Sequence, residues 1–217
     1  MSRYHERPGR ITGIDACWSV ARGGRLRSVV EADASVDVVV RLGERGPRLG
    51  VERATIEALY IDLTGDDEVL GVRLVPGHGE PLRPLEGLLA AEATALWKRG
   101  DLTSQALEDL VAARLCAPPA LVSDFVFAAR ERRGDLRLSG PGERALQRAA
   151  RTWLGLRPKT LLRIERARAA ARALAGGETA VDVALDLGFA DQPHLTRELH
   201  ALLGRTPSEI FKTAAPR

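Results

Sequence analysis

The chain has 217 residues and a formal net charge of +3, with 45% hydrophobic and 28% charged residues, a composition typical of a globular protein of one or two domains. No apolar run reaches the roughly 18–20 residues of a membrane span and the first ten residues lack the apolar core of a secretory signal, so we expect a cytoplasmic protein without membrane contact. The two cysteines, Cys17 and Cys116, lie far apart, which argues against a disulfide framework or a cysteine zinc module.

The first part of the chain is predicted to form strands. Three segments are dense in β-branched residues, namely 34–42, 56–63 and 69–75. Clusters of Gly, Asp and Pro separate these segments, which is typical of short strands joined by turns. We therefore expect an α+β protein whose residues 1–82 form an antiparallel, partly barrel-like β-rich domain that senses a signal or contacts a partner.

Residues 83–134 are predicted to be a helical connector. Apolar residues recur there at helical spacing in three segments, with Thr103 or Ser104 as the N-cap of the second. The segments are 85–96, 107–115 and 121–128.

From residue 135 onward the chain is basic and its apolar spacing is helical. Residues 135–217 hold 14 Lys or Arg against 9 Asp or Glu, whereas residues 1–134 hold 18 against 20. Between residues 137 and 172 the ratio reaches 10 against 2. This asymmetry indicates an acidic partner for the C-terminal part, with double-stranded DNA as the first candidate. Apolar periodicity predicts helices over 143–154 and 158–175.

A helix-turn-helix motif is predicted between residues 179 and 203. We expect Val181, Ala184 and Leu185 on the buried face of its first helix. Gly188 follows where a left-handed residue would end that helix and turn the chain. Phe189 is expected to be a buried plug between the two helices.

The second helix of the motif is predicted to begin at Asp191, a residue type that caps helices. Its inward face would consist of leucines, namely Leu195, Leu199, Leu202 and Leu203. The outward face would carry hydrogen-bonding side chains suited to DNA, namely Gln192, His194, Thr196 and Arg197. Arg197 could pair with guanine and Gln192 with adenine. Thr206 to Glu209 has the pattern of a capping box for a further helix.

These residues resemble a known family. The segments 187–199 and 203–207 resemble the second helix-turn-helix of AraC-type transcription regulators, and the segment 154–167 resembles the linker helix of that family. The N-terminal segments 17–20, 35–40 and 71–77 resemble an uncharacterised domain fused to some members. The resemblance implies a sequence-specific DNA-binding transcription regulator that inserts its second helix-turn-helix into the major groove, with 135–217 as an all-helical DNA-binding domain.

The resemblance further implies a first helix-turn-helix unit, whose DNA-facing residues would be Arg144, Gln147, Arg148 and Arg151. The recognition helix of this unit would begin at Glu143. The preceding segment 138–142 is too short to hold the helix that normally supports it, so we expect a truncated first unit. The exposed Arg that follows the capping box in the family is replaced by Phe211. On the linker helix, Arg163, Arg166 and Arg168 are suited to phosphates or solvent.

Two other functions stay open. The truncation is compatible with an AraC-derived ligand-binding or protein-interaction module that has lost DNA binding. An enzyme built in the N-terminal half around Asp37 or His78 is the second alternative, although no catalytic motif supports it and we expect no enzyme activity. Asp37, or His78 with Glu80, could instead line a pocket for a small-molecule effector at the N-terminal domain.

No cofactor or metal is predicted. His194, Glu198 and His200 do not share one helix face, so they are expected to be surface residues and not zinc ligands. The segment 140–145 has the spelling of a dinucleotide-binding loop, but the residues after it are helical, which does not fit that fold. The oligomeric state, including a homodimer, stays open.

Overall fold

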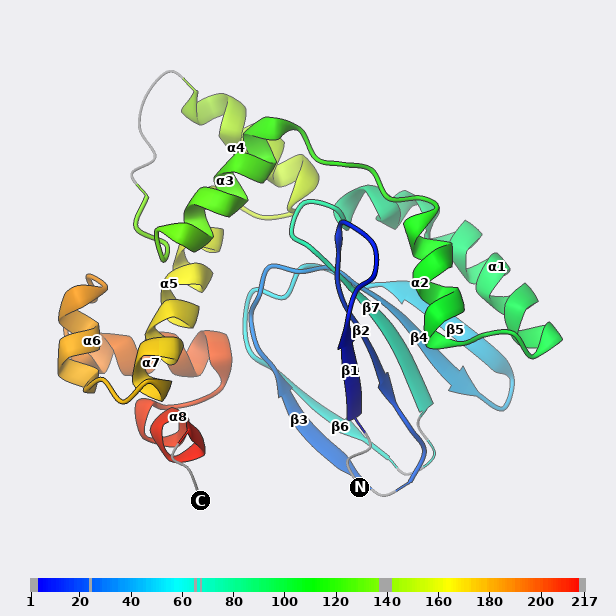
Figure 1. The fold of residues 1–217 in the computed structure, drawn as a ribbon, viewed down its shortest axis with the longest axis horizontal. Coiled ribbons are helices and arrows are strands. Elements are labelled where there is room, and N and C mark those ends of the chain that lie inside the picture. Colours follow the sequence, from blue (N-terminus) through cyan, green and yellow to red (C-terminus); the bar gives the residue numbers. More distant parts are fainter. Residues whose placement is uncertain (1–3, 24, 65, 67, 137–141, 215–217) are drawn as a thin grey trace.

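The computed structural model describes residues 4–214 except 24, 65, 67 and 137–141, and it places two sheets first and a run of helices after them (Figure 1). The strands are β1 (Tyr4–Pro8), β2 (Ile14–Val20), β3 (Leu26–Val30), β4 (Asp37–Gly43), β5 (Gly46–Val51), β6 (Leu59–Leu63) and β7 (Glu68–Leu74). The helices are the 3-10 helix η1 (Glu80–Leu85), then α1 (Glu86–Arg99), α2 (Ser104–Ala112), α3 (Ala120–Glu131), α4 (Glu143–Trp153), α5 (Pro158–Ala175), α6 (Ala180–Asp186), α7 (Gln192–Leu203) and α8 (Pro207–Ala214).

The strands form an antiparallel five-stranded sheet in the order β1-β2-β7-β4-β5 and a separate two-stranded ribbon of β3 and β6. The three predicted strand segments correspond to β4, β6 and β7. The α+β class and the N-terminal antiparallel β-rich region are therefore confirmed. In the described residues the sheet stays open and does not close into a barrel.

One face of the five-stranded sheet is covered by α1 and α2, which pack on β5 and on β7 and β2. Alternate strand residues supply this core because successive side chains point to opposite faces, and Cys17, Val38 and Val72 are all buried in it. In contrast, α3 packs against α4 and α5. The helices of 83–134 are thus shared between the sheet and the C-terminal helices, while the domain boundaries at 82 and 134 stay predictions.

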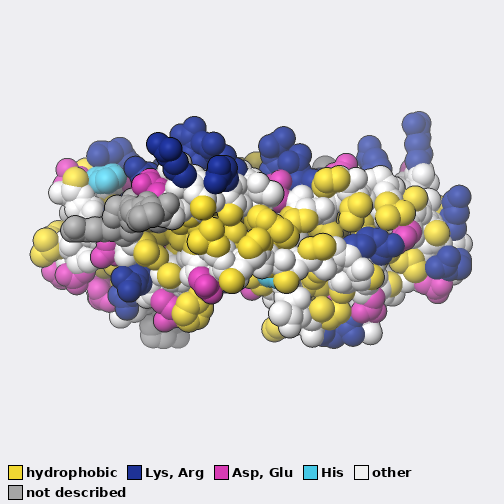
Figure 2. Space-filling view, turned by 90° about the horizontal axis from the view of Figure 1, so that it is seen from above, with side chains coloured by type: hydrophobic (Ala, Val, Ile, Leu, Met, Phe, Trp, Pro, Cys, Tyr) yellow, Lys and Arg dark blue, Asp and Glu magenta, His cyan; other side chains and the backbone are white. Residues whose placement is uncertain are grey.

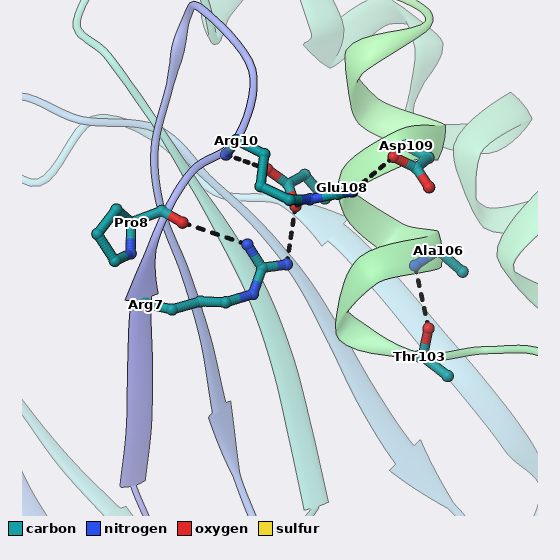
Figure 3. A network of polar contacts seen from close by, with 7 residues as sticks. All are labelled: Arg7, Pro8, Arg10, Thr103, Ala106, Glu108 and Asp109. Atoms are coloured by element: carbon teal, nitrogen blue, oxygen red, sulfur yellow. Dashed lines mark hydrogen bonds and ion pairs between the residues drawn. The ribbon is translucent and has the colours of Figure 1, made fainter.

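A buried carboxylate fastens α2 to the loop after β1 (Figure 3). Glu108 is fully buried, and its Oε2 lies 2.7 Å from Arg7 Nη2 and 2.8 Å from Arg10 Nε. The backbone N–H of Arg10 donates to Glu108 Oε1 at 2.6 Å. Burial alone would raise the pKa of Glu108, but the hydrogen bonds from Arg10 and Arg7 outweigh it and lower the pKa to about 2. Thr103 caps α2 by accepting from the Ala106 N–H, as predicted.

The C-terminal helices share one core around α5. Its buried residues Leu161, Ile164 and Leu174 pack with the leucines of α7, and α5 also contacts α3, α4, α6 and α8. The predicted helix 158–175 is confirmed residue for residue. Within the described part of the chain, no helix combines the length and apolarity that crossing a membrane requires.

The C-terminal end of α7 is docked on the N-terminal part of the chain. The N–H groups of Ala32 and Ala58 donate to the carbonyls of Leu202 and Ala201 at 2.7 and 2.9 Å. These carbonyls belong to the last turn of α7, where no intrahelical donor remains. Gly204 then takes a left-handed φ of 66°, and a Cβ on it would lie 2.7 Å from the Val29 side chain. A glycine is therefore required at this junction both for the turn and for the close approach.

Candidate nucleic-acid interface

The turn between α6 and α7 has the geometry that its sequence predicts. Thr179 caps α6 by accepting from the Asp182 N–H at 3.2 Å. Gly188 ends the helix with a φ of 67°, a conformation that L side chains rarely adopt. Asp191 then caps α7 by accepting from the His194 N–H at 2.6 Å. The two helices and their connection are thus fixed by local residues.

The buried face of α6 differs from the prediction. Val181 and Leu185 are 61% and 78% exposed, whereas Val183 and Ala184 are buried. Residues three and four apart share a helix face, so the stripe that contacts α5 and α7 runs from Ala180 through Val183 and Ala184. The prediction that Val181 and Leu185 face inward was wrong, because apolar character alone does not decide which side of a short helix contacts its neighbours.

Phe189 is the plug between the two helices, at 7% exposure, as predicted. The edge of the His194 ring meets it, with ring centroids 5.6 Å apart. The Arg166 guanidinium lies over the same ring, 5.3 Å from its centroid. This contact is a cation–π interaction, so Arg166 supports the turn rather than standing free in solvent.

The outer side of α7 carries the four predicted DNA contacts, but in two different environments. Gln192 and Arg197 are exposed, and their side chains have no hydrogen-bond or ion-pair partner among the described residues. His194 is half-buried, and its Nδ1 accepts from the Ala190 N–H at 3.2 Å. Thr196 is half-buried as well, and its Oγ1 donates to the Gln192 carbonyl at 3.0 Å. The structure therefore leaves Gln192 and Arg197 free to meet a partner.

His200 is a further exposed residue on this side of α7. It follows Arg197 by three residues, a spacing that places two side chains on neighbouring positions of one helix face. Sequence reasoning considered His200 only as a metal ligand. The same spacing rule could have placed it beside Arg197 at the interface.

An ion pair locks α7 to α5 from the inner side. Arg163 donates to both carboxylate oxygens of Glu198, at 2.5 and 3.0 Å. Bidentate pairing fixes orientation as well as distance. Arg168 lies 3.8 Å from the buried carboxylate of Glu165. The arginines of α5 that sequence reasoning assigned to phosphates or solvent thus have partners inside the protein.

The predicted capping box is present before α8. The Thr206 N–H donates to Glu209 Oε2 at 2.7 Å, and the Glu209 N–H donates back to Thr206 Oγ1 at 3.4 Å. These hydrogen bonds lower the pKa of Glu209 below its ordinary value. Phe211, which stands where the resemblance expects Arg, is 52% exposed.

The first unit contains α4, and the helix that precedes α4 among the described residues is α3, which packs against it. Between α3 and α4 the described residues form turns and no helix, and residues 138–141 lie outside the described residues. Leu146 and Ala150 bury one side of α4. All four predicted DNA contacts of this helix are exposed, namely Arg144, Gln147, Arg148 and Arg151.

The upper face of the molecule separates charged from hydrophobic side chains along its whole length (Figure 2). Figure 2 shows Lys and Arg side chains gathered along one edge of this face, next to a band of hydrophobic side chains. Gln147 is held by its own helix, because its Nε2 donates to Glu143 Oε1 at 2.9 Å. The three arginines of α4 have no ion pair with the described residues, so they present an unneutralised positive edge.

The N-terminal candidates lie in separate contacts. Asp37 Oδ1 is 3.4 Å from Arg73 Nε, and burial raises the pKa of Asp37 to about 6. His78 packs against Gly13, and Glu80 pairs with Arg83 at 3.2 Å. None of these contacts joins Asp37 to His78 or Glu80. In the part of the chain that the structure describes, no three His, Cys, Asp or Glu side chains are grouped to hold a metal ion.

Comparisons with known proteins bear on the C-terminal region. Residues 138–213 match a protein family described as a helix-turn-helix domain. No curated protein matches the chain. Among solved structures, one of ToxT from Vibrio cholerae O395 has 8% sequence identity, covers 99% of both chains and has a TM-score of 0.43. A second ToxT structure, in the P21 form, has 7% identity, covers 97% of this chain and 98% of ToxT, and has a TM-score of 0.40.

A third ToxT structure, bound to (E)-4-(8-methylnaphthalen-1-yl)but-3-enoic acid, has 8% identity, covers 99% of this chain and all of ToxT, and has a TM-score of 0.40. The family match coincides with the segment in which α4 to α8, the turn at Gly188 and the capping box were found. The C-terminal region of this chain is thus a helix-turn-helix domain of the AraC type, and such a domain supports a DNA-binding transcription regulator.

Proposed function

We propose that this protein regulates transcription by recognising a specific DNA sequence, with α7 inserted into the major groove. The observation that carries the proposal is the exposed pair Gln192 and Arg197, whose side chains have no partner among the described residues, on a helix that is held at both ends. Arg is suited to the O6 and N7 atoms of guanine, and Gln to the N6 and N7 atoms of adenine. His194 and Thr196 contribute by holding the start of α7 in place.

We assign a different role to α4. Its arginines form a free positive edge, but no short second helix is found between α3 and α4 among the described residues. Arginines that are not held in one position can still bind phosphates, because electrostatic attraction does not require a precise geometry. In this proposal α4 adds affinity that is independent of sequence, and α7 supplies the specificity.

The N-terminal sheet with α1 and α2 is proposed to regulate this activity in response to a small-molecule effector. Ala32 and Ala58, which flank the β3–β6 ribbon, donate to the carbonyls of Leu202 and Ala201 and so link the N-terminal part of the chain directly to the end of α7. A cytoplasmic location goes with this function. The alternative function is that of an interaction module without DNA binding, and the incomplete first helix-turn-helix unit is the observation that favours it.

Fluorescence anisotropy with labelled duplex DNA over a range of salt concentrations separates these two functions. For a DNA-binding regulator, the logarithm of the affinity falls linearly and steeply with the logarithm of salt concentration, because bound phosphates release counterions. An interaction module shows no binding to duplex DNA even at low salt. Glu44→Gln, at an exposed position in the turn between β4 and β5, is a matched surface control and should bind like the wild type.

A further inference from the structure

A cluster of charged side chains lies on the face of the five-stranded sheet opposite α1 and α2. Asp37 of β4 and Arg73 of β7 stand directly across from each other in the register of the two strands. Val38 and Val72, the next residue and the previous one, are buried in the core under α1 and α2. Successive residues of a strand point to opposite faces, so Asp37 and Arg73 lie on the other side. Asp33, between β3 and β4, reaches the same arginine.

The negative charges of this cluster outnumber the positive ones. Arg73 Nε lies 3.3 Å from Asp33 Oδ2 and 3.4 Å from Asp37 Oδ1. Arg73 Nη1 lies 3.8 Å from Glu6 Oε2 on β1, and the Tyr4 hydroxyl donates to that carboxylate. One guanidinium therefore faces three carboxylates, and no other Lys or Arg of the described residues forms an ion pair with them.

Asp37 is the carboxylate of the cluster with the weakest support for a negative charge. Its side chain is only 13% exposed, and its Oδ1 is buried without a hydrogen-bond partner among the described residues. Its neighbour on the β5 side is Glu52, another acid, whose N–H donates to the Asp37 carbonyl at 2.8 Å. A buried carboxylate that is incompletely compensated favours proton uptake. Burial raises the pKa of Asp37 most, Arg73 lowers it and Asp33 raises it again, with a result of about 6.

Asp33 has a structural task in addition to its ion pair. Its Oδ1 accepts the N–H of Ser35 at 2.8 Å and so closes a tight turn. Ala34, between these two residues, is buried and has a φ of 60°, a left-handed conformation that is unfavourable for residues other than glycine. Such a backbone persists only where its surroundings hold it. The ion pair between Asp33 and Arg73 is therefore part of what keeps this turn in shape.

The same turn holds the end of α7. Ala32 directly precedes Asp33, and its N–H donates to the Leu202 carbonyl at 2.7 Å. The N–H groups of Asp33 and Ala34 donate to the Thr55 carbonyl at 3.3 and 3.1 Å, which ties the turn to the segment before β6. A change in how Asp33 is held thus acts one residue away from the contact with α7.

We propose that Asp37 is a proton-operated switch, in which proton uptake by its carboxylate leaves Arg73 to Asp33 and tightens the turn that holds α7. With Asp37 charged, two carboxylates compete for the Nε of one guanidinium. With Asp37 neutral, the competition ends and Arg73 pairs fully with Asp33. Glu6 is 41% exposed and is solvated in both states. The N-terminal part of the chain thereby responds to acidification from neutral pH.

The direct test is carbon-13 NMR of the full chain, labelled at the aspartate carboxyl groups, without DNA. The Asp37 resonance, assigned through its backbone neighbours in the wild type, should titrate about two pH units above an ordinary aspartate. Asp33→Asn should move this midpoint down by about half a unit or more, because a negative neighbour is removed and Arg73 is left to Asp37. Asp124→Asn, exposed on α3, is the control and should leave the midpoint unchanged.

Two results of this titration would overturn the proposal. The first is an Asp37 carboxyl that titrates below about pH 5, since it would then be charged at every pH that a neutral cell approaches. The second is a midpoint that stays the same in Asp33→Asn, since the two carboxylates would then not share Arg73.

Amide hydrogen exchange at Ala32 tests whether the turn tightens. In the wild type, the ratio of the exchange rate at Ala32 to that at Leu107 of α2 should fall by about threefold or more between pH 7.5 and pH 5. Both rates share the intrinsic effect of pH, so the ratio reports the local opening of the turn. Asp37→Asn fixes the neutral state and should show the low ratio at both pH values. A wild-type ratio that does not change would overturn the switch, even with Asp37 titrating as expected.

The consequence for DNA rests on the proposed function and is tested separately. Asp37→Asn should bind a preferred duplex about threefold or more tightly than the wild type at pH 7.5, and equally at pH 5, because its turn is already tight. Comparison of the two proteins at one pH cancels every other group that titrates. Equal affinities at pH 7.5 would refute the coupling to DNA. A protein that binds no DNA but shows the titration and the exchange effect would refute the proposed function alone.

Discussion

The helices α4 and α7 both expose arginines, yet they are held in the protein by different means. The start of α7 is fixed by the Asp191 cap and the turn at Gly188, and its end is capped by N–H groups of the N-terminal part. Among the described residues α4 buries Leu146 and Ala150 and contacts α3, α5 and η1, but no further helix lies between α3 and α4. A helix with a charged face is therefore enough for affinity to DNA. Recognition of bases requires in addition that the protein holds the helix in a fixed position.

The largest effect should come from removing the plug of the second unit. Phe189→Ala leaves a cavity beneath Arg166 and His194 and should cost about 3 kcal/mol or more in the free energy of unfolding. Urea unfolding followed by circular dichroism measures this cost. Phe189→Leu keeps most of the apolar volume and should lose clearly less. Equal losses for the two variants would show that Phe189 is not a packed plug.

A substitution in α2, far from α4 and α7, should lower the free energy of unfolding without changing how these two helices bind DNA. Glu108→Gln should cost about 2–3 kcal/mol at pH 7, since two charged hydrogen bonds to Arg7 and Arg10 are weakened. The pKa of Glu108 is lowered from 4.5 to about 2, so its contribution is complete above pH 4.5 and is lost as the pH falls towards 2.

Denaturant unfolding of this variant and the wild type at several pH values checks the sign. The gap between them should narrow below pH 4.5 and close near pH 2. A gap that widens on acidification would contradict the assignment. The ratio of affinities for preferred and random DNA should be the same in both proteins.

The contrast in base reading depends on Arg197. Arg197→Ala should reduce discrimination between the preferred and a substituted DNA site by about 1–3 kcal/mol, because one bidentate base contact is lost. Anisotropy with the two duplexes measures this difference directly. Arg197→Lys keeps the charge without the fork and should recover affinity for any DNA but little discrimination. Unchanged discrimination in both variants would remove Arg197 from the interface.

Glycine substitutions before α7 and before α4 test whether the two helix starts differ in conformation. Gly188→Ala should cost about 1–2 kcal/mol in the free energy of unfolding, because its φ of 67° is unfavourable for an L residue although the space beside it is free. Gly142 precedes α4 with a φ of −86° and equally free space. Gly142→Ala should therefore be nearly neutral. Thermal unfolding of the two variants measures this difference. Equal losses of stability would show that the left-handed turn at Gly188 does not require a glycine.

The smallest effect is expected on α4. Arg148→Ala should weaken binding to all sequences alike and reduce the salt slope by about 0.9, the value for one phosphate contact. Salt titrations with a preferred and a random duplex measure this. Arg148→Lys should restore the slope. A loss confined to one DNA sequence would mean that α4 reads bases as well.

Much of the second unit could be predicted from sequence because its determinants are local. Asp191, Gly188 and the Thr206–Glu209 box each act on residues three or four positions away, and all three were found as predicted. The inner face of α6 was misassigned at Val181 and Leu185, since only contact with α5 and α7 decides which apolar residue is buried.

Contacts between residues far apart in the chain have no comparable signal in the sequence. The pairing of Arg163 with Glu198 spans 35 residues, and that of Glu31 with Arg205 spans 174. Charge composition predicted free arginines on α5, but their partners depend on how α5 and α7 cross. The hydrogen bond from Ala32 to Leu202 joins backbone groups, so no pattern of side chains in the sequence could predict it.

The most direct test of the division between the two helices is selection from a pool of random duplex DNA, followed by sequencing, with wild type, Arg197→Ala and Arg148→Ala in parallel. The account predicts an enriched motif for the wild type, the loss of that motif for Arg197→Ala, and the same motif at lower yield for Arg148→Ala. A motif that survives Arg197→Ala, or vanishes with Arg148→Ala, would contradict the assignment of sequence reading to α7.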